Sequence, residues 1–272
     1  MSTILDAIAT HAHERTRAAA AALPFAELEE RALSRREGKT PFAFERALSA
    51  PGLSLVCEVK KASPSKGVIV EDFPYLQIAR EYEKAGAQAV SVITEPKYFL
   101  GSDDYLREIA EEIRLPVLRK DFVVDRRQVY EAAALGAEAV LLICAILDRN
   151  TLAQCLRDCD RLGVSALVET RSEAETHRAV DAGARVIGVN NRDLRTFQVD
   201  LAASVRLRRF IPDSALFVSE SGVKTHADIR MLMEHGADEH ALDAALIGES
   251  CMRSSDKARY LAGLRGVEEN AE

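Results

Sequence analysis

Short apolar runs recur along the chain, and four of them follow a helical stretch that ends in Gly-Ala. These segments are AGAQAVSVIT (85–94), LGAEAVLLIC (135–144), AGARVIGVNN (182–191) and HGADEHALDAALIGES (235–250). Glycine is expected where a helix ends in a left-handed conformation. A short apolar run after it is typical of a strand that is buried on both faces. The pattern therefore predicts four helix–strand units.

Four more apolar runs lie between these units. They are SLVCEVKK (54–61), LPVLRKDF (115–122), SALVETR (165–171) and ALFVSESG (215–222), and amphipathic stretches such as 74–85, 126–135 and 226–235 separate the runs. Eight strands that alternate with helices predict a parallel sheet, and its natural closed form is a single (β/α)₈ TIM barrel. A doubly wound open sheet is the alternative. It requires a Gly-rich phosphate loop after the first strand, and the sequence after Glu58 contains none.

The first 50 residues fall outside this repeat. They are rich in Ala and in charged residues, with breaks at Pro24 and around residues 38–41. We therefore expect two parts in an α/β protein: a helical N-terminal extension over residues 1–50, packed on the barrel, and the barrel itself over residues 51–272.

Composition limits the partners of the chain. With 272 residues, 47% hydrophobic and 29% charged, it has the make-up of a soluble globular protein. The net charge of −7 disfavours nucleic acid and anionic membranes as partners. No apolar stretch approaches the roughly 20 residues of a spanning helix. Residues 1–17 do not have the pattern of a secretory signal.

The cysteines and histidines give no sign of a metal site. An odd number of cysteines, five, is scattered through apolar segments, which indicates buried, reduced thiols in a cytoplasmic protein. Cys155 and Cys159 stand four apart in a predicted helix without a second Cys or His pair. None of the six His has the spacing of metal ligands. We therefore expect no metal ion.

Polar side chains gather where the predicted strands end. Because side chains alternate along a strand, Val56, Glu58 and Lys60 share one face. The other strand ends supply Lys120, Glu169, Asn190, Glu220 and Ser221. A single polar residue at a strand end often has no catalytic role, because polar residues are common where the chain leaves the core. Several charges converging on a barrel mouth are costly to bury unless they are paired and used, so the pattern predicts a Lys/Glu acid–base site.

Glycine-containing turns follow the last two strands of the predicted barrel. They are Ser221-Gly222 and Gly248-Glu249-Ser250. Glycine is common in turns for conformational reasons alone, but here it also lets backbone N–H groups approach an anion, close to a helix N-terminus. Barrels of this kind commonly bind phosphate at this corner. The sequence therefore predicts a small phosphorylated substrate.

From about residue 40 onward the sequence resembles the indole-3-glycerol-phosphate synthase family. The most specific matching segments are CEVKKASPSKG (57–67), VITEPKYFLGS (92–102), LRKDFVVD (118–125), LVETRSEAE (167–175), IGVNNRDL (187–194) and VSESGVKT (218–225). The resemblance implies ring closure, decarboxylation and dehydration of 1-(o-carboxyphenylamino)-1-deoxyribulose 5-phosphate. The product is indole-3-glycerol phosphate, an intermediate of tryptophan biosynthesis, and no cofactor is required.

The resemblance also implies a role for each matching residue. Lys120 resembles the general acid, with Lys60 as the alternative, and Glu169 resembles the general base. Glu58 assists the base, and Glu220 supports the lysines. The residues that resemble substrate contacts are Asn190 and Arg192 at the anthranilate end, Phe99 beside the ring, and Ser63, Ser221, Gly222, Gly248 and Glu249 near the phosphate. We expect partial burial and Lys60 to lower the pKa of Lys120, against the opposing effect of Glu58 and Glu220.

One segment departs from the family pattern, because the family usually connects its last helix and strand by a short turn. Here the connection from Gly236 to Gly248 is longer. We expect residues 237–243 to form a loop or a short helical turn on the face opposite the active site.

Two other functions stay open at this point. A phosphosugar isomerase similar to phosphoribosylanthranilate isomerase would use a Cys/Asp pair, which the Glu/Lys set disfavours. A catalytically silent barrel would serve as a subunit or scaffold, and the intact set of polar residues argues against it. We expect a monomer or a weak homo-oligomer.

Overall fold

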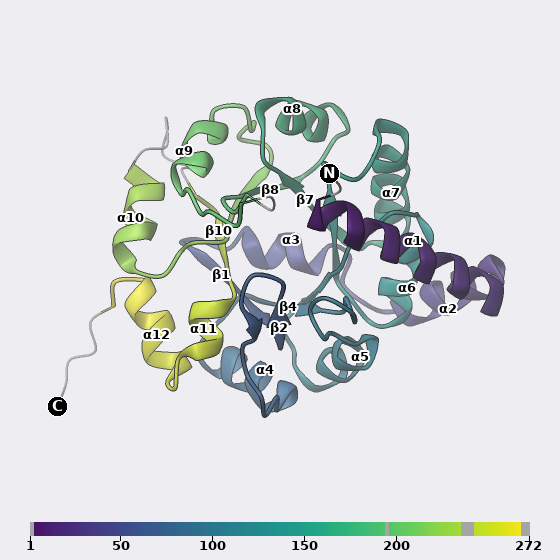
Figure 1. Ribbon diagram of the computed structural model, residues 1–272, viewed down its shortest axis with the longest axis horizontal. Helices are drawn as coiled ribbons and strands as arrows, with labels where there is room; N and C mark the ends of the chain where they lie inside the picture. The colour runs from purple at the N-terminus through teal and green to yellow at the C-terminus, as the bar shows by residue number, and fades with distance from the viewer. Residues whose placement is uncertain (1–2, 194–195, 235–241, 268–272) are drawn as a thin grey trace.

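A closed barrel of eight parallel strands forms the centre of the computed structural model, which describes residues 3–193, 196–234 and 242–267 (Figure 1). Around the barrel the strands follow the order β1-β10-β9-β8-β7-β6-β5-β4. They are β1 (Ser54–Val59), β4 (Ala89–Ile93), β5 (Val117–Lys120), β6 (Ala139–Ile143), β7 (Ser165–Thr170), β8 (Val186–Asn190), β9 (Leu216–Glu220) and β10 (Ala244–Ile247). Each predicted strand is present, and the expected TIM barrel is confirmed.

Helices surround the strands in a ring (Figure 1). They are α4 (Tyr75–Lys84), α5 (Asp103–Glu112), α6 (Arg127–Ala134), α7 (Arg149–Leu162), α8 (Glu173–Asp181), α9 (Ala202–Arg208), α10 (His226–Glu234), α11 (Glu249–Arg253) and α12 (Lys257–Leu264). Helix α7 shows how the sequence sets these bounds. The side chain of Asp148 caps its N-terminus by accepting from the Thr151 N–H, and Gly163 ends it in the left-handed conformation.

Three helices precede the barrel: α1 (Ile4–Ala22), α2 (Phe25–Arg36) and α3 (Ala43–Leu48). Figure 1 shows α1 in front of the strands and α3 behind them. Helix α2 packs along α6, where the rings of Phe25 and Tyr130 meet edge to face at 4.9 Å. Because α3 inserts Phe44 and Leu48 among the inward side chains of the barrel, the extension and the barrel share a core.

Inward-facing side chains divide the barrel interior into an apolar bottom and a polar mouth. Val56, Leu118 and Leu167 pack with Phe44 and Leu48 near the bottom. The inward positions closer to the carboxyl ends of the strands carry charged groups instead. A short antiparallel hairpin, β2 (Ala62–Ser63) with β3 (Gly67–Val68), follows β1 at the mouth.

The connection that departs from the family pattern is described only at its end. The prediction for residues 237–243 falls mostly on residues 235–241, which lie outside the described residues. Leu242 is buried, and Asp243 accepts a hydrogen bond of 2.7 Å from the Phe217 N–H just before β10 begins. No helix in the described ranges is long and apolar enough to cross a membrane.

Candidate active site

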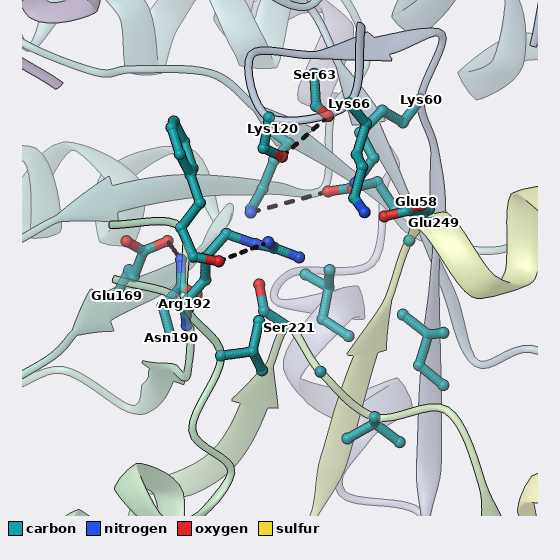
Figure 2. Close-up of a pocket in the computed structure, with 18 of the residues that line it drawn as sticks. Glu58, Lys60, Ser63, Lys66, Lys120, Glu169, Asn190, Arg192, Ser221 and Glu249 are labelled. Carbon is teal, nitrogen blue, oxygen red and sulfur yellow. Dashed lines mark hydrogen bonds and ion pairs between the residues drawn. The ribbon is translucent and has the colours of Figure 1, made fainter. Parts of the chain in front are cut away.

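A cavity of about 980 Å³ opens at the mouth of the barrel (Figure 2). Twelve of the thirteen predicted site residues line it: Glu58, Lys60, Ser63, Phe99, Lys120, Glu169, Asn190, Arg192, Ser221, Gly222, Gly248 and Glu249. They come from loops and strand ends all around the barrel. The structure thus brings together residues that lie up to about 190 positions apart in the sequence.

Glu220 is the exception, because it lies below the cavity rather than in its wall. Its side chain is only 1% exposed, and it is not among the lining residues. Its Oε2 lies 3.3 Å from Lys120 Nζ, so it contacts the site through that lysine, as expected for a residue that supports the lysines.

The charged residues at the strand ends form the floor of the cavity. Glu58 and Lys60, at the end of β1, make up one side of this charged floor. Lys60 Nζ donates to Glu58 Oε1 at 2.5 Å. Burial alone raises the pKa of Glu58, but Lys60 and Lys120 more than offset this and leave it below the usual value. Glu58 is therefore ionised at neutral pH.

Lys120 stands at the centre of the floor and reaches toward Glu58 (Figure 2). Its Nζ lies 3.8 Å from Glu58 Oε2, besides the contact with Glu220. The expectation of a lowered pKa is wrong for this structure. Burial lowers the pKa of Lys120, but the surrounding carboxylates Glu220, Glu58 and Glu169 outweigh burial and raise it. Lys120 therefore carries its proton at any working pH.

Glu169 is held by a partner on each carboxylate oxygen. Arg171 donates to Oε1 at 2.7 Å, and the side-chain amide of Asn190 donates to Oε2 at 3.1 Å. Burial raises the pKa of Glu169, but Arg171 and then Lys120 more than offset this and lower it. A general base must be in its ionised, proton-accepting form, and Glu169 meets this requirement. Sequence reasoning missed Arg171, although its place two residues after Glu169 repeats the spacing of Glu58 and Lys60.

Two glycines make room for these carboxylates in the barrel wall. A Cβ on Gly188 would lie 2.2 Å from Glu220 Oε1, and one on Gly248 would lie 2.5 Å from Glu58 Oε1. Neither carboxylate is free to move away from such a Cβ, because both are buried and ion-paired. Gly248 was assigned to phosphate binding from the sequence, and the structure gives it this steric role as well.

The loop after β9 has a constrained backbone beside the cavity. Ser221 has φ 67 and Gly222 has φ 95, and a Cβ on Gly222 would lie 2.4 Å from Val199 Cγ1. Asn191, which was not predicted, fixes this loop by donating to the Ser221 carbonyl at 3.0 Å. Left-handed backbone at a non-glycine residue costs free energy and is concentrated at functional sites.

The opposite part of the cavity is apolar. Phe99 and Phe122 face each other with centroids 5.9 Å apart, and Ile8 and Ile143 also line the wall. The buried carboxylate of Glu95 holds the Phe99 loop by accepting from backbone N–H groups, including that of Phe99 at 3.1 Å. The cavity therefore has a charged floor, an apolar wall suited to a planar ring and a glycine-lined edge.

Comparisons with known proteins agree with this geometry. The family described as indole-3-glycerol phosphate synthase matches residues 5–264. The chain belongs to this family. The indole-3-glycerol phosphate synthase of Ruminiclostridium cellulolyticum is 53% identical over 86% of this chain and 88% of its own length. That of Endomicrobium trichonymphae is 47% identical over 96% of this chain and 99% of its own length.

A solved structure shares the fold at low identity. The 3-hexulose-6-phosphate synthase of Salmonella typhimurium superposes with a TM-score of 0.63 at 14% identity, over 79% of this chain and 98% of its own. This likeness supports the barrel fold alone. Membership of the synthase family rests on the sequence matches, and it leaves the isomerase alternative without support. The described lining of the cavity contains no Cys for the Cys/Asp pair that such an isomerase would use.

In this member of the synthase family, α1 is tied to the mouth by two buried carboxylates. Arg15 forms a bidentate pair with Asp121, the residue after Lys120, at 2.6 and 3.1 Å. His11 Nδ1 lies 3.0 Å from Glu95 Oε1. Both carboxylates sit directly beside site residues, so α1 is part of the frame of the site. The sequence indicated a packed extension but not these contacts.

The described residues offer no ready metal ligands. No group of three or more His, Cys, Asp or Glu side chains among them is arranged to hold a metal ion. All five cysteines are free and buried.

Proposed function

We propose that this chain converts 1-(o-carboxyphenylamino)-1-deoxyribulose 5-phosphate to indole-3-glycerol phosphate, CO₂ and water, with the charged floor of the barrel mouth as its catalytic machinery. The observation that carries the proposal is the Lys120 site: a fully charged lysine surrounded by three buried carboxylates, between an apolar wall and a glycine-lined edge. The family implies the reaction and the residue roles, and the geometry of the site supports both.

The substrate lies across the floor, with its phosphate at the glycine-lined edge. Backbone N–H groups around Ser221, Gly222 and Gly248 bind the phosphate, with Ser63 on the facing hairpin. The Glu249 side chain turns to Arg253, at 3.1 Å, so this site uses the backbone of Glu249 rather than its charge. The carboxyphenyl ring packs against Phe99, and Arg192 with Asn190 orients the anthranilate end.

Lys120 acts in the first step as the general acid. The ring carbon that bears the carboxylate attacks the ribulose carbonyl carbon, and the carbonyl oxygen becomes a hydroxyl group. Negative charge develops on that oxygen only as the new bond forms, so a lysine with a raised pKa transfers its proton to the forming alkoxide rather than to the carbonyl. Its positive charge stabilises the oxyanion at the same time.

The later steps need an electron sink and a base. Ring attack leaves a cationic iminium at the substrate nitrogen, which accepts the electron pair when CO₂ leaves and the ring becomes aromatic again. The hydroxyl group then departs as water with a proton from a lysine of the floor. Glu169 removes a proton from the adjacent methylene carbon, which forms the indole double bond.

The test is an assay of the purified protein. Indole fluorescence should rise when the carboxyphenylamino-deoxyribulose phosphate is added without metal or cofactor. One CO₂ should be released for each indole formed. An inert, folded protein would support the silent-barrel alternative instead.

The cellular compartment and the oligomeric state of the protein form part of the proposal. Five buried free thiols are typical of the reducing cytoplasm. All the residues assigned to the reaction come from one chain, which is compatible with a monomer or a weak homo-oligomer. Light scattering on the eluting protein tests this, and a stable dimer at low micromolar concentration would contradict it.

A further inference from the structure

Strands β1 and β7 end in the same arrangement, a buried carboxylate with a cation two positions later. On β1, Lys60 bonds Glu58 at 2.5 Å, and on β7, Arg171 bonds Glu169 at 2.7 Å. Residues two apart on a strand face the same side. Each carboxylate therefore receives its counter-ion from its own strand.

Strand β9 lacks this arrangement. Its carboxylate, Glu220, is followed two positions later by Gly222, and the nearby cation is Lys120 from β5 at 3.3 Å. Neither Glu220 oxygen accepts a hydrogen bond from the part of the chain that the structure describes. Burial raises the pKa of Glu220 to about 7. Glu58 and Glu169 are just as buried, but their cations outweigh burial and lower the pKa of each.

Arg171 acts most strongly on Glu169, and more weakly on Glu175 and Glu220. Its own backbone N–H donates to Glu175 Oε2 at 2.9 Å, which anchors the residue at the start of α8. Its side chain lines the cavity and is 19% exposed. Its Nε is buried and makes no hydrogen bond within the described ranges, so the ion pair with Glu169 is its main attachment.

We propose that Arg171 is a positioning residue that orients the Glu169 carboxylate and keeps it in its ionised, proton-accepting form. The proposal rests on the role of Glu169 as the base in the function proposed above. Arg171 on Oε1 and Asn190 on Oε2 hold the carboxylate plane from both sides. The positive charge offsets the burial of Glu169 and the repulsion from Glu220 nearby.

Other charged and titratable groups also face Glu169 and enter its protonation. They are Lys120 from β5, Cys144 after β6, Glu175 from α8 and Glu220 from β9. Only Lys120 among them is a cation, and it is shared with Glu58 and Glu220. Removing Arg171 therefore leaves Glu169 with a shared counter-ion and three anionic or ionisable neighbours.

The test compares Arg171→Gln with the wild type in the dependence of kcat/KM on pH. Loss of the cation raises the pKa of Glu169, so the base is protonated over a wider acidic range. The acid limb of the profile should shift to higher pH by roughly one unit or more. Turnover at the acidic end should fall about tenfold for each unit, while KM at pH 8 changes little.

Three further variants separate the explanations. Arg171→Lys keeps the charge and should return the acid limb toward the wild-type position. Arg185→Gln removes an arginine that bonds Glu45 and Asp160 at the bottom of the barrel, and it should leave the profile unchanged. Glu169→Gln should abolish turnover. Thermal melting and circular dichroism on each variant establish that it is folded.

Each outcome bears on one claim. If the wild type is active, Glu169→Gln is inactive and the Arg171→Gln profile coincides with that of the wild type, this proposal fails while the proposed function stands. A uniform rise in KM at every pH with an unmoved limb also overturns it, because Arg171 would then be a substrate clamp. If Arg171→Gln does not fold, an unrestored limb in Arg171→Lys contradicts the proposal. Turnover retained in Glu169→Gln would instead overturn the role of the base.

Discussion

The two ends of the barrel are built from the same eight strands, but their interiors differ. At the bottom, Phe44 and Leu48 of α3 fill the barrel with apolar side chains that are almost fully buried. At the mouth, the corresponding inward positions carry charges instead: the partly buried Lys120 and the buried carboxylates Glu58 and Glu220. Burial of apolar side chains stabilises the fold, whereas burial of charged side chains has a desolvation cost. We therefore interpret the buried charges as serving catalysis rather than stability. The comparison predicts that substitutions at the bottom of the barrel mainly change stability, whereas substitutions at the mouth mainly change turnover.

The largest effect is expected at Lys120. Lys120→Met keeps the approximate length of the side chain and removes the proton, so turnover should fall by roughly 10²–10⁴-fold. Substrate affinity should change much less, because the phosphate binds at the glycine-lined edge. Stopped-flow turnover and equilibrium binding measure the two separately. Near-normal turnover with lost binding would make Lys120 a clamp and Lys60 the acid.

The matching change at the bottom is Phe44→Ala. Phe44 is fully buried, and its removal leaves a cavity under the barrel. The free energy of unfolding should fall by about 3–5 kcal/mol. Turnover of the folded fraction at 20 °C should equal that of the wild type. A turnover loss as large as that of Lys120→Met would show that the two ends are not independent.

Glu220→Gln tests whether the buried charge at the mouth destabilises the protein. The pKa of Glu220 is raised from 4.5 to about 7. A raised pKa stabilises the fold fully below pH 4.5, and this contribution is lost as the pH rises through 7. Gln does not titrate, so the variant should gain up to about 3 kcal/mol relative to the wild type between pH 4.5 and pH 8. Urea unfolding at both pH values measures this, and a constant difference would contradict it.

A smaller, matched comparison uses two arginines of the extension, one that contacts each end of the barrel. Arg15 pairs with Asp121 at the mouth, and Arg36 pairs with Glu138 near the bottom. Each change to Ala should cost roughly 1.5–3 kcal/mol of stability, because it removes a charge-assisted hydrogen bond. Arg15→Ala alone should also lower turnover by roughly tenfold, because Asp121 directly follows Lys120. Equal turnover in the two variants would show that α1 does not help to position the site residues.

The features that the sequence predicted are those that depend on residues close together in the chain. The eight strands followed from local signals, the helix-ending glycines and the apolar runs, because each depends on neighbours in the chain. The strand ends followed less closely from these signals: the run 115–122 is longer than β5 (Val117–Lys120) at both ends, and the carboxylate of Asp121 just beyond β5 accepts hydrogen bonds from Arg15 and Thr94. The clustering of the charged residues followed from fold geometry, because parallel strands end at one mouth.

Long-range properties were beyond the sequence. The pKa of Lys120 was predicted in the wrong direction because it depends on the summed effect of three carboxylates from different strands. The position of Glu220 below the cavity did not follow from the sequence, because alternation gives the face of a strand but not the depth of a side chain. The contacts of α1 and α3 were missed because nothing local indicates which end of the barrel a helix covers.

The most direct test of the account is a crystal structure of the protein with indole-3-glycerol phosphate bound. The phosphate should accept hydrogen bonds from the backbone around Ser221, Gly222 and Gly248, and the indole ring should pack against Phe99. Lys120 and Glu169 should face the two indole carbons that lost the hydroxyl group and the proton, directly or across one water molecule. A product bound in the reverse orientation, or away from Lys120, would contradict the account.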